Sequence, residues 1–223
     1  MASVTSRIRL GTTVTPVPRR HPWKLAAEAV ALDHLSGGRV ILGVGAGDPA
    51  DPSIGRVIDG SSQIGDGSDR RVLAERLDEA LGLIDALWSG EPVHYAGAHY
   101  RVDGLQLAAR PVQRPRIPVW VGGDLTKPGV RRRIRRWDGS CAYKGRTDRP
   151  QWITPTDVSE LLAEVAEERG SSGGFDVKVS GDDSPCLIAD LVAAGATWWG
   201  RWVGPADPEV TRGIVLAGPP AIG

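Results

Sequence analysis

The sequence predicts an α/β fold whose strands run parallel. Short apolar segments with the period of a strand alternate along the chain with about six segments that have the period of a helix. Such alternation is typical of parallel strands joined by right-handed crossovers. In addition, residues 39–45 form a continuous apolar run, as expected for a strand that is buried on both faces. These observations leave two architectures open, an open doubly wound sheet and a barrel.

The composition fits one globular domain over residues 1–223. The 223 residues are 41% hydrophobic, which is too apolar for a disordered chain and sufficient for a sizeable core. The 27 basic and 27 acidic side chains cancel, so we expect neither nucleic acid nor a membrane surface as a partner. Two cysteines cannot form a disulfide framework, and the sequence starts without an apolar signal segment. Both observations favour a cytoplasmic protein.

The first predicted elements are a strand, a helix, a buried strand and a second helix. Alternating apolar side chains predict a strand over residues 7–14, which Pro16 ends. Residues 22–35 have helical spacing and start with a proline, which is favoured at the first position of a helix. The buried strand over residues 39–45 follows, and the strongest helical pattern covers residues 69–88.

Two long excursions interrupt the alternation. Residues 48–68 are rich in Gly, Ser, Asp and Pro, which predicts a long loop. Residues 91–116 contain two short strand patterns, 93–95 and 99–102, around a glycine, which predicts a hairpin.

The second half of the chain resumes the alternation. Strands are predicted over residues 117–121, 139–143, 175–179 and 197–203. Helices are predicted near residues 128–136, 154–170, 184–194 and 207–217. The second of these helices has a strong start, since Thr154 can cap it, Pro155 follows, and Asp157 lies in the first turn.

A glycine-rich segment, Gly43 to Gly47, follows the buried strand. A Rossmann dinucleotide site needs G-x-G-x-x-G leading into a helix, but here Asp48 stands at the third glycine position and a loop follows. This speaks against a nicotinamide-binding site. Two roles remain open for the glycines: they allow a tight bend at the strand end, or they let the backbone approach a flat ring or a phosphate.

A second glycine pair, Gly122–Gly123, has the same place at a strand end. Backbone N–H groups in such a turn can hold phosphate oxygens. Residues 110–149 contain twelve Lys and Arg against three Asp, a strong local excess of positive charge. Most arginines of residues 131–136 fit a solvated helix face, whereas Lys144 and Arg146 are better placed to hold an anion.

No metal site and no catalytic residue can be identified from the residues themselves. The four histidines lack metal-ligand spacing with Cys or carboxylates. The sequence has no G-x-S-x-G motif, and neither cysteine stands in a recognisable nucleophile signature.

Nine motifs, spread over nearly the whole chain, resemble one known family. They lie at residues 8–16, 19–24, 32–47, 76–80, 87–92, 97–100, 118–123, 137–139 and 194–199. In this order they resemble the bacterial luciferase-like monooxygenases. The resemblance implies a TIM-type (β/α)8 barrel that binds FMN or the deazaflavin coenzyme F420 at the carboxyl ends of its strands. It also implies a flavin- or deazaflavin-dependent oxidoreductase or monooxygenase that acts on a small-molecule substrate.

The resemblance also assigns cofactor-binding residues. Thr13 and Val14 match the family's non-proline cis peptide, a bulge that backs the isoalloxazine ring. Other matches line the ring (Ala46, Gly47 and Asp48, with Asp51 near them), form the phosphate turn (Gly122 and Gly123) or add phosphate contacts (Tyr143 and Arg146). No catalytic residue can be carried over.

The sequence departs from the family at its start. The segment that resembles the family's third strand, residues 6–11, follows Met1 almost directly, which predicts an incomplete barrel of about six strand–helix units with the first two missing. In relatives those units carry a catalytic acid or histidine. An incomplete barrel has open sheet edges, so we expect a homo-oligomer or a rearranged loop to cover them. The alternative function is a catalytically inactive, truncated barrel that binds flavin weakly or serves as a structural subunit.

Overall fold

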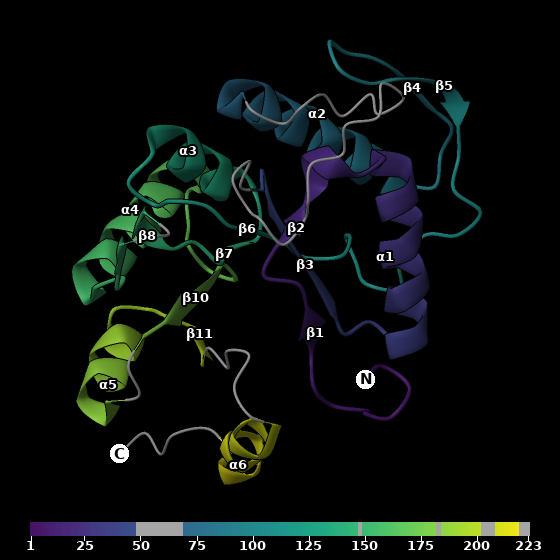
Figure 1. Cartoon of the computed structure of the whole chain (residues 1–223). Coiled ribbons are helices and arrows are strands. Elements are labelled where there is room, and N and C mark those ends of the chain that lie inside the picture. Colours follow the sequence, from purple (N-terminus) through teal and green to yellow (C-terminus); the bar gives the residue numbers. More distant parts are fainter. Residues whose placement is uncertain (48–68, 147–148, 182–183, 202–207, 219–223) are drawn as a thin grey trace. The chain divides into compact units, whose positions relative to one another are not determined.

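The computed structural model describes residues 1–47, 69–146, 149–181, 184–201 and 208–218 (Figure 1). The chain divides into two compact units, Met1–Gly122 and Gly123–Gly223. We describe each unit by itself. The expectation of a single domain stays a prediction.

The sheet of the first unit is parallel, with β3 (Val40–Gly45) at its centre. On one side, β3 pairs with β1 (Leu10–Gly11) and β2 (Thr15–Pro16), and on the other side with β6 (Val119–Val121). All six residues of β3 are buried, so the prediction of a strand covered on both faces is confirmed.

The predicted strand over residues 7–14 is wrong in extent. The chain forms only β1 there, leaves the ladder at residues 12–14, and returns as β2, followed by the 3₁₀ helix η1 (Val17–Arg19). The peptide bond between Thr13 and Val14 is cis, as the family resemblance implies. The alternating pattern predicts too long a strand because Ile8 and Val14, at 45% and 38% exposed, do not form a buried strand face.

Two helices cover the sheet of the first unit. Helix α1 (Pro22–Ser36) packs against β3 and against α2 (Arg70–Trp88). Helix α1 ends at Gly37, whose φ of 67° is the left-handed conformation that favours glycine. Helix α2 buries one apolar stripe of Leu73, Leu77, Ala80, Leu81, Leu83, Ile84, Leu87 and Trp88. Both predicted helices are thus confirmed.

The predicted hairpin is present and longer than expected. Strands β4 (Val93–Ala96) and β5 (Arg101–Leu105) pair antiparallel (Figure 1). The Glu79 carboxylate of α2 accepts hydrogen bonds from the backbone N–H groups of Ala98, His99 and Tyr100 at 2.9, 3.0 and 3.2 Å. The turn of the hairpin is therefore fixed to α2.

A buried carboxylate also fixes the segment that leads from the hairpin back to β6. Asp33 of α1 is fully buried and accepts hydrogen bonds from the backbone N–H groups of Val112 and Gln113 at 2.7 and 3.1 Å. Its second oxygen accepts from Gln113 Nε2 at 2.8 Å. The Asp33 charge is thus balanced by three donors, as a buried carboxylate requires.

The sheet of the second unit is also parallel. Strand β10 (Asp176–Ser180) lies between β7 (Gly139–Ser140) and β11 (Trp198–Gly200). The helices of this unit are α3 (Pro128–Arg136), α4 (Pro155–Arg169), α5 (Pro185–Ala193) and α6 (Pro208–Ala217). All seven elements lie where the sequence predicts them. Strand β7 is shorter than predicted, β10 has the predicted length shifted by one residue, and residues 202–203 of the last predicted strand lie outside the described residues.

The predicted start of α4 is confirmed in detail. Thr154 Oγ1 accepts a hydrogen bond from the Asp157 backbone N–H, and the Asp157 carboxylate accepts from the Thr154 N–H in return. This reciprocal pair is a capping box.

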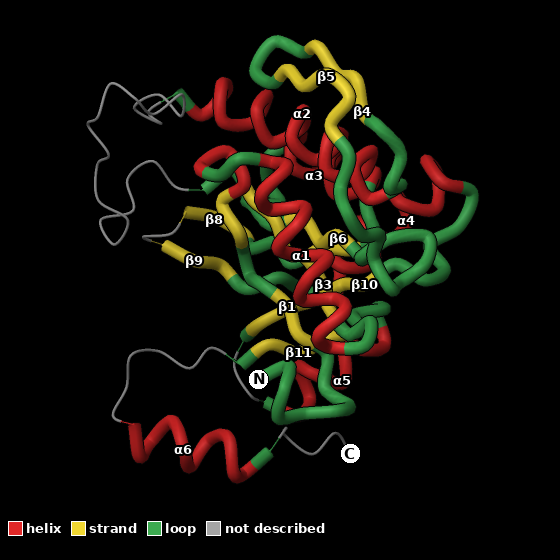
Figure 2. Tube along the Cα trace, turned by 90° about the vertical axis from the view of Figure 1, so that its right-hand side faces the viewer, coloured by secondary structure: helices red, strands yellow, loops and turns green. Residues whose placement is uncertain are grey.

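A second hairpin, β8 (Lys144–Arg146) with β9 (Arg149–Gln151), was not predicted (Figure 2). Its residues are basic and include Gly145 and Pro150, so they lack the alternation of apolar and polar side chains by which a strand is recognised in a sequence.

The expectation that most arginines of α3 face solvent is also wrong. Arg131 and Arg135 form ion pairs with Glu164 of α4, and Arg135 also pairs with Glu168 at 2.6 Å. Arg133 is buried. Much of the local positive charge is therefore neutralised by the acidic face of α4.

Both units consist of parallel strands and helices, so the α/β class is confirmed. With β1 and β2 counted as one interrupted strand, the described residues contain six parallel strands, whereas a complete TIM barrel has eight. Among the helices that the structure describes, none combines the length and the apolar character needed to cross a lipid bilayer.

Candidate functional site

In the first unit, the predicted ring-binding residues gather at the carboxyl end of β3. The bulge at residues 12–14 lies beside this end because β2 resumes pairing there, Thr15 with Val44 and Pro16 with Gly45. The Gly122 backbone N–H donates to the Val44 carbonyl at 2.8 Å, which brings the end of β6 to the same place. Thr13, Val14, Ala46, Gly47 and Gly122 thus belong to one edge of this sheet, where ligands of parallel sheets bind.

Side-chain hydroxyls fix the bulge to β3. Thr12 Oγ1 donates a hydrogen bond to the Gly43 carbonyl at 2.8 Å, and Thr15 Oγ1 donates to Thr12 Oγ1 at 3.0 Å. Thr15 itself is buried. The Val14 side chain therefore projects from a bulge held on both sides, and it is 38% exposed.

The glycines at this edge are needed for close approach. A Cβ atom on Gly45 would lie 2.9 Å from Val14 Cγ2, closer than carbon atoms normally come. Gly47 has a φ of 81°, and a Cβ there would lie 3.0 Å from Pro16 Cβ. The positive φ of Gly47 fits the tight bend that the sequence left open, and both close contacts are with side chains of the chain itself. The approach of this backbone to a ring or a phosphate stays a prediction.

In the second unit, the predicted phosphate residues Gly123 and Tyr143 lie together. The Tyr143 N–H donates to the Gly123 carbonyl at 3.0 Å, and the Leu125 N–H donates to the Tyr143 carbonyl at 2.8 Å. Gly123 has a φ of 143°, and a Cβ there would lie 3.0 Å from Val130 of α3. The Tyr143 side chain is 44% exposed.

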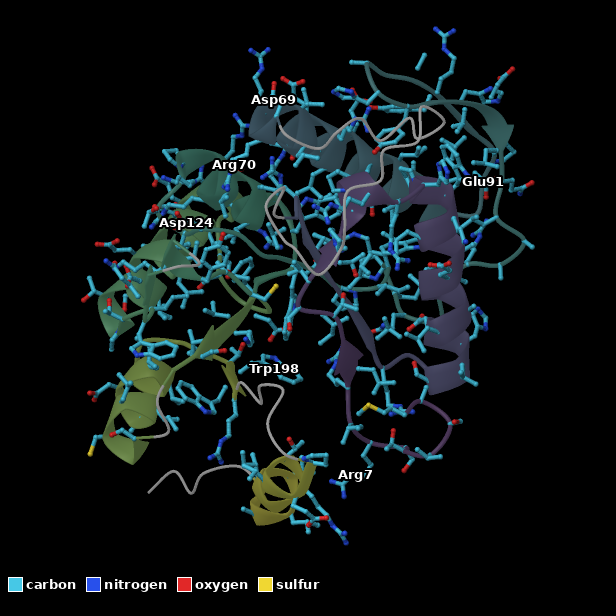
Figure 3. The ribbon with its side chains drawn as sticks, in the orientation of Figure 1. Arg7, Asp69, Arg70, Glu91, Asp124 and Trp198 are labelled. Carbon is cyan, nitrogen blue, oxygen red and sulfur yellow. The ribbon has the colours of Figure 1, made fainter. Side chains whose placement is uncertain are left out.

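Asp124 organises this loop (Figure 3). Its Oδ1 accepts hydrogen bonds from the Thr126 N–H at 3.0 Å, from Thr126 Oγ1 at 2.8 Å and from the Gly145 N–H at 3.2 Å. The loop after Gly123 and the strand β8 are therefore joined by one carboxylate. We did not predict this role, although an Asp two residues before a Thr is a known turn signal.

Of four further predicted positions, three lie wholly or partly outside the described residues and the fourth has another partner. Asp48 and Asp51 lie outside the described residues, and so does the side chain of Arg146, whose backbone belongs to β8. Lys144 does not serve as a free anion-binding charge, because its Nζ lies 2.8 Å from both carboxylate oxygens of Asp157. This contradicts the expectation for Lys144.

The curated relatives that match this chain include oxidoreductases of two kinds. The chain is 37% identical over 132 residues to 4-hydroxyprotoasukamycin monooxygenase from Streptomyces nodosus subsp. asukaensis, a match that covers 58% of this chain and 33% of the relative. It is 32% identical over 193 residues to an F420-dependent glucose-6-phosphate dehydrogenase from Kineococcus radiotolerans, covering 83% of this chain and 52% of the relative. The chain thus spans between about a third and about half of the length of these relatives.

Solved structures of the same kind share the fold. The F420-dependent tetrahydromethanopterin reductase from Methanopyrus kandleri superposes with a TM-score of 0.73 at 20% identity, over 99% of this chain and 84% of the reductase. The FMN-bound oxygenating constituent of 3,6-diketocamphane monooxygenase from Pseudomonas putida superposes with a TM-score of 0.57 at 19% identity, over 79% of this chain and 48% of that one.

These likenesses agree with the order of motifs along the sequence and with the cis peptide after Thr13. The family of luciferase-like monooxygenases matches residues 1–190, which is most of the chain. The chain therefore belongs to the luciferase-like monooxygenase family.

Proposed function

We propose that this protein binds coenzyme F420 or FMN and catalyses hydride transfer or monooxygenation on a small-molecule substrate. The observation that carries the proposal is the bulge at residues 12–14, fixed by hydroxyl groups at the carboxyl end of β3. Both cofactors consist of a flat tricyclic ring and a phosphate-bearing tail, and different residues of the chain would bind the two parts.

The ring half rests on the first unit. A flat ring needs an apolar surface that does not move, and the half-exposed Val14 side chain offers one on a fixed bulge. Gly45 and Gly47 keep the neighbouring strand end free of side chains. The residues present therefore fit the ring of either cofactor.

The phosphate half rests on the second unit. The loop from Gly123 to Thr126 is held by backbone hydrogen bonds to Tyr143 and by the Asp124 carboxylate. Such a fixed turn before a helix, bonded to the backbone of the partly exposed Tyr143, fits a phosphate ester. The roles of Tyr143 and Arg146 as phosphate contacts stay predictions.

The cofactor and the protein would have separate roles in the reaction. The ring supplies the two-electron chemistry when bound, and the protein supplies binding, orientation and exclusion of water. In this chain, Val14 would fix the face of the ring that is turned away from the substrate. Solved structures with the same kind of fold include an F420-dependent secondary alcohol dehydrogenase and a Baeyer–Villiger monooxygenase in complex with FMN, so the proposal includes both reactions and both cofactors. No observation favours the inactive alternative over the enzyme.

The test is a titration of the purified protein with F420 and, separately, with FMN, followed by ring absorbance and fluorescence. We expect saturable binding of one of them. The matched variants are Gly45→Ala, which pushes a methyl group against Val14, and Gly82→Ala on α2, where no atom lies within 4 Å of the new Cβ. Gly45→Ala should weaken binding at least tenfold. Gly82→Ala should bind like the wild type, and its free energy of unfolding should be higher by about 0.5–1 kcal/mol, because alanine is the better helix former.

Two results would contradict the proposal. The first is that neither cofactor binds to the folded wild-type protein. The second is that Gly45→Ala, shown to be folded by circular dichroism, binds the cofactor as tightly as the wild type, because the ring would then lie elsewhere.

A further inference from the structure

A lysine and a serine, neither of them assigned a role above, form a hydrogen-bonded pair on the sheet of the second unit. Lys178 and Ser180 lie two residues apart on β10, so both side chains project from the same face, opposite the buried Val177 and Val179. Lys178 Nζ donates a hydrogen bond to Ser180 Oγ at 2.6 Å. Both side chains are half-buried.

The neighbouring strand makes room for this pair. In the β10–β11 ladder, Ser180 is opposite Gly200, and a Cβ atom on Gly200 would collide with Lys178 Cε and lie 2.7 Å from Nζ. The lysine side chain therefore lies across the bare backbone of Gly200. Ser180 and Gly200 are the last residues of their parallel strands, and this end of a parallel sheet is where ligands bind.

The charged groups that the structure describes around Lys178 do not neutralise it. Asp176, on the same face of β10, accepts hydrogen bonds from Trp198 Nε1 and Thr197 Oγ1 at 3.1 Å each (Trp198 is labelled in Figure 3). Cys141, just after β7, is buried, and burial raises the pKa of its thiol to about 12, so it stays protonated at neutral pH. Among the described residues, Lys178 forms no ion pair, in contrast to Lys144 with Asp157.

Burial shifts the lysine toward its neutral form. It lowers the pKa of Lys178 below the ordinary value of a lysine, and the opposing influence of Cys141 is the smaller of the two. A desolvated lysine of this kind is one of the established ways in which proteins obtain a nucleophilic amine at neutral pH.

We propose that Lys178 is a nucleophilic amine that takes up small aldehydes or ketones as an imine, with Ser180 as the proton carrier. The inference does not depend on the proposed cofactor, since imine formation involves no change of oxidation state.

Imine formation needs no reactant beyond the amine and the carbonyl compound. The lone pair of neutral Nζ forms a bond to the carbonyl carbon, and the carbonyl oxygen takes up a proton, which gives a carbinolamine. The hydroxyl group then leaves as water after a second protonation, and nitrogen releases its protons as the C=N bond forms. Ser180 Oγ, which already accepts a hydrogen bond from Nζ, can receive a proton from nitrogen and pass one to the oxygen.

The chain is well suited to a direct test because it has only four lysines: Lys24, Lys127, Lys144 and Lys178. The full-length protein is treated at pH 7 with propanal and sodium cyanoborohydride, which reduces each imine to a stable secondary amine, and each site is quantified by peptide mass spectrometry. The same reaction in urea gives the rate of each lysine in the unfolded chain. The folded-to-unfolded ratio of rates then reports what the fold does to each amine.

We expect the folded-to-unfolded ratio of rates to be at least three for Lys178. It should be near one for Lys24 and Lys127, whose side chains are 72% and 69% exposed and lie 3.9 and 4.0 Å from a carboxylate oxygen. It should be below one for Lys144, which pairs with Asp157 at 2.8 Å. A ratio at or below one for Lys178 would overturn the proposal, because the amine would then be merely shielded.

Two variants separate the roles of the pair. Lys178→Arg should remove the adduct assigned to this site and leave the other three lysines unchanged. Ser180→Ala should lower the ratio of Lys178 severalfold, again with unchanged ratios at the other three sites, which also shows that the variant is folded. An undiminished rate at Lys178 in Ser180→Ala would refute the proton-carrier role of Ser180.

Discussion

Asp157 shows how one side chain can join two segments that are distant in sequence. Its carboxylate accepts hydrogen bonds from the N–H and the hydroxyl of Thr154 at 2.8 and 2.7 Å, and from Lys144 Nζ at 2.8 Å. Burial alone would raise the pKa of Asp157, but these hydrogen bonds outweigh burial and lower that pKa below its ordinary value. The ionised carboxylate is therefore more stable in the folded chain than in the unfolded one.

This lowered pKa predicts a pH-dependent contribution to stability. A carboxylate whose pKa is lower in the folded state stabilises the protein fully above its unfolded-state pKa of about 3.9, and the contribution is lost as pH falls through the folded-state value. We therefore expect Asp157→Asn to lower the free energy of unfolding by about 2 kcal/mol at pH 7, and by progressively less below about pH 4. Urea unfolding of the wild type and the variant over a series of pH values measures this difference.

Glu167→Gln is the matched control. It removes one negative charge from the exposed face of the same helix, and we expect it to change the free energy of unfolding by less than about 0.5 kcal/mol. A destabilisation by Asp157→Asn that stayed constant from pH 7 to pH 3 would contradict the assignment.

At the level of elements, helix α2 and the β4–β5 hairpin depend on each other through Glu79. Three backbone N–H groups of the hairpin turn have this one carboxylate as their acceptor. A two-stranded hairpin alone is only marginally stable in water, so its attachment to a long buried helix accounts for its order.

We therefore predict that Glu79→Ala loosens the hairpin without unfolding α2. Amide hydrogen exchange at residues 93–105 should become at least tenfold faster, because three donors lose a charged acceptor, whereas exchange within α2 should change little. Asp103→Ala serves as the control, since it removes only an exposed contact with His94 on the same hairpin. Equal effects of the two variants would show that Glu79 does not hold the turn.

The elements also show which parts of the fold can be predicted from sequence. Helix α2 and the start of α4 were predictable because their signals, an apolar stripe and a capping pair, lie within a few residues of one another. The interrupted first strand was not, because β2 depends on its pairing with β3 and not on its own side chains. The β8–β9 hairpin was missed for a similar reason, since its sequence carries no strand pattern.

The candidate site also has a part that could be predicted from sequence and a part that could not. The structure places Thr13, Val14 and Gly47, which the family resemblance assigns to the ring, at the carboxyl end of β3, whereas the residues alone left a bend and an approach to a ring or phosphate both open. Their contact with a cofactor stays a prediction. The partners that fix the site are the Thr12 hydroxyl on the Gly43 carbonyl and the Asp124 carboxylate on the Gly145 N–H. They depend on contacts between segments that composition and periodicity do not report. The same holds for Lys144, whose charge pairs with a carboxylate thirteen residues away.

For the whole molecule, we propose that the chain self-associates. Helix α6 has no buried residue, and its Val210, Val215 and Leu216 are 54%, 68% and 74% exposed. Apolar side chains gathered on one exposed helix are a common mark of an interface. A second copy of the chain would cover these side chains, and it would also cover the open sheet edges of an incomplete barrel.

The prediction is a dimer or larger assembly at micromolar concentration, measured by light scattering coupled to size exclusion. The double substitution Val215→Glu with Leu216→Glu should shift the protein toward a monomer, because two charges would be buried without partners. Val112→Glu, at a 44% exposed position in the first unit, should leave the assembly unchanged. A wild-type protein that is monomeric under these conditions would contradict the proposal.

Asp33 has a consequence for how this chain can change over generations. The excursion between α2 and β6 is tied down in its middle by Glu79 and at its return by Asp33, so the strand that follows starts from a defined place. Lengthening or exchanging the exposed loop at residues 108–109, which lies between these two anchors, would alter the outer surface while leaving the register of β6 with β3 untouched. Insertions and deletions should therefore be tolerated in that loop far better than a single substitution of Asp33.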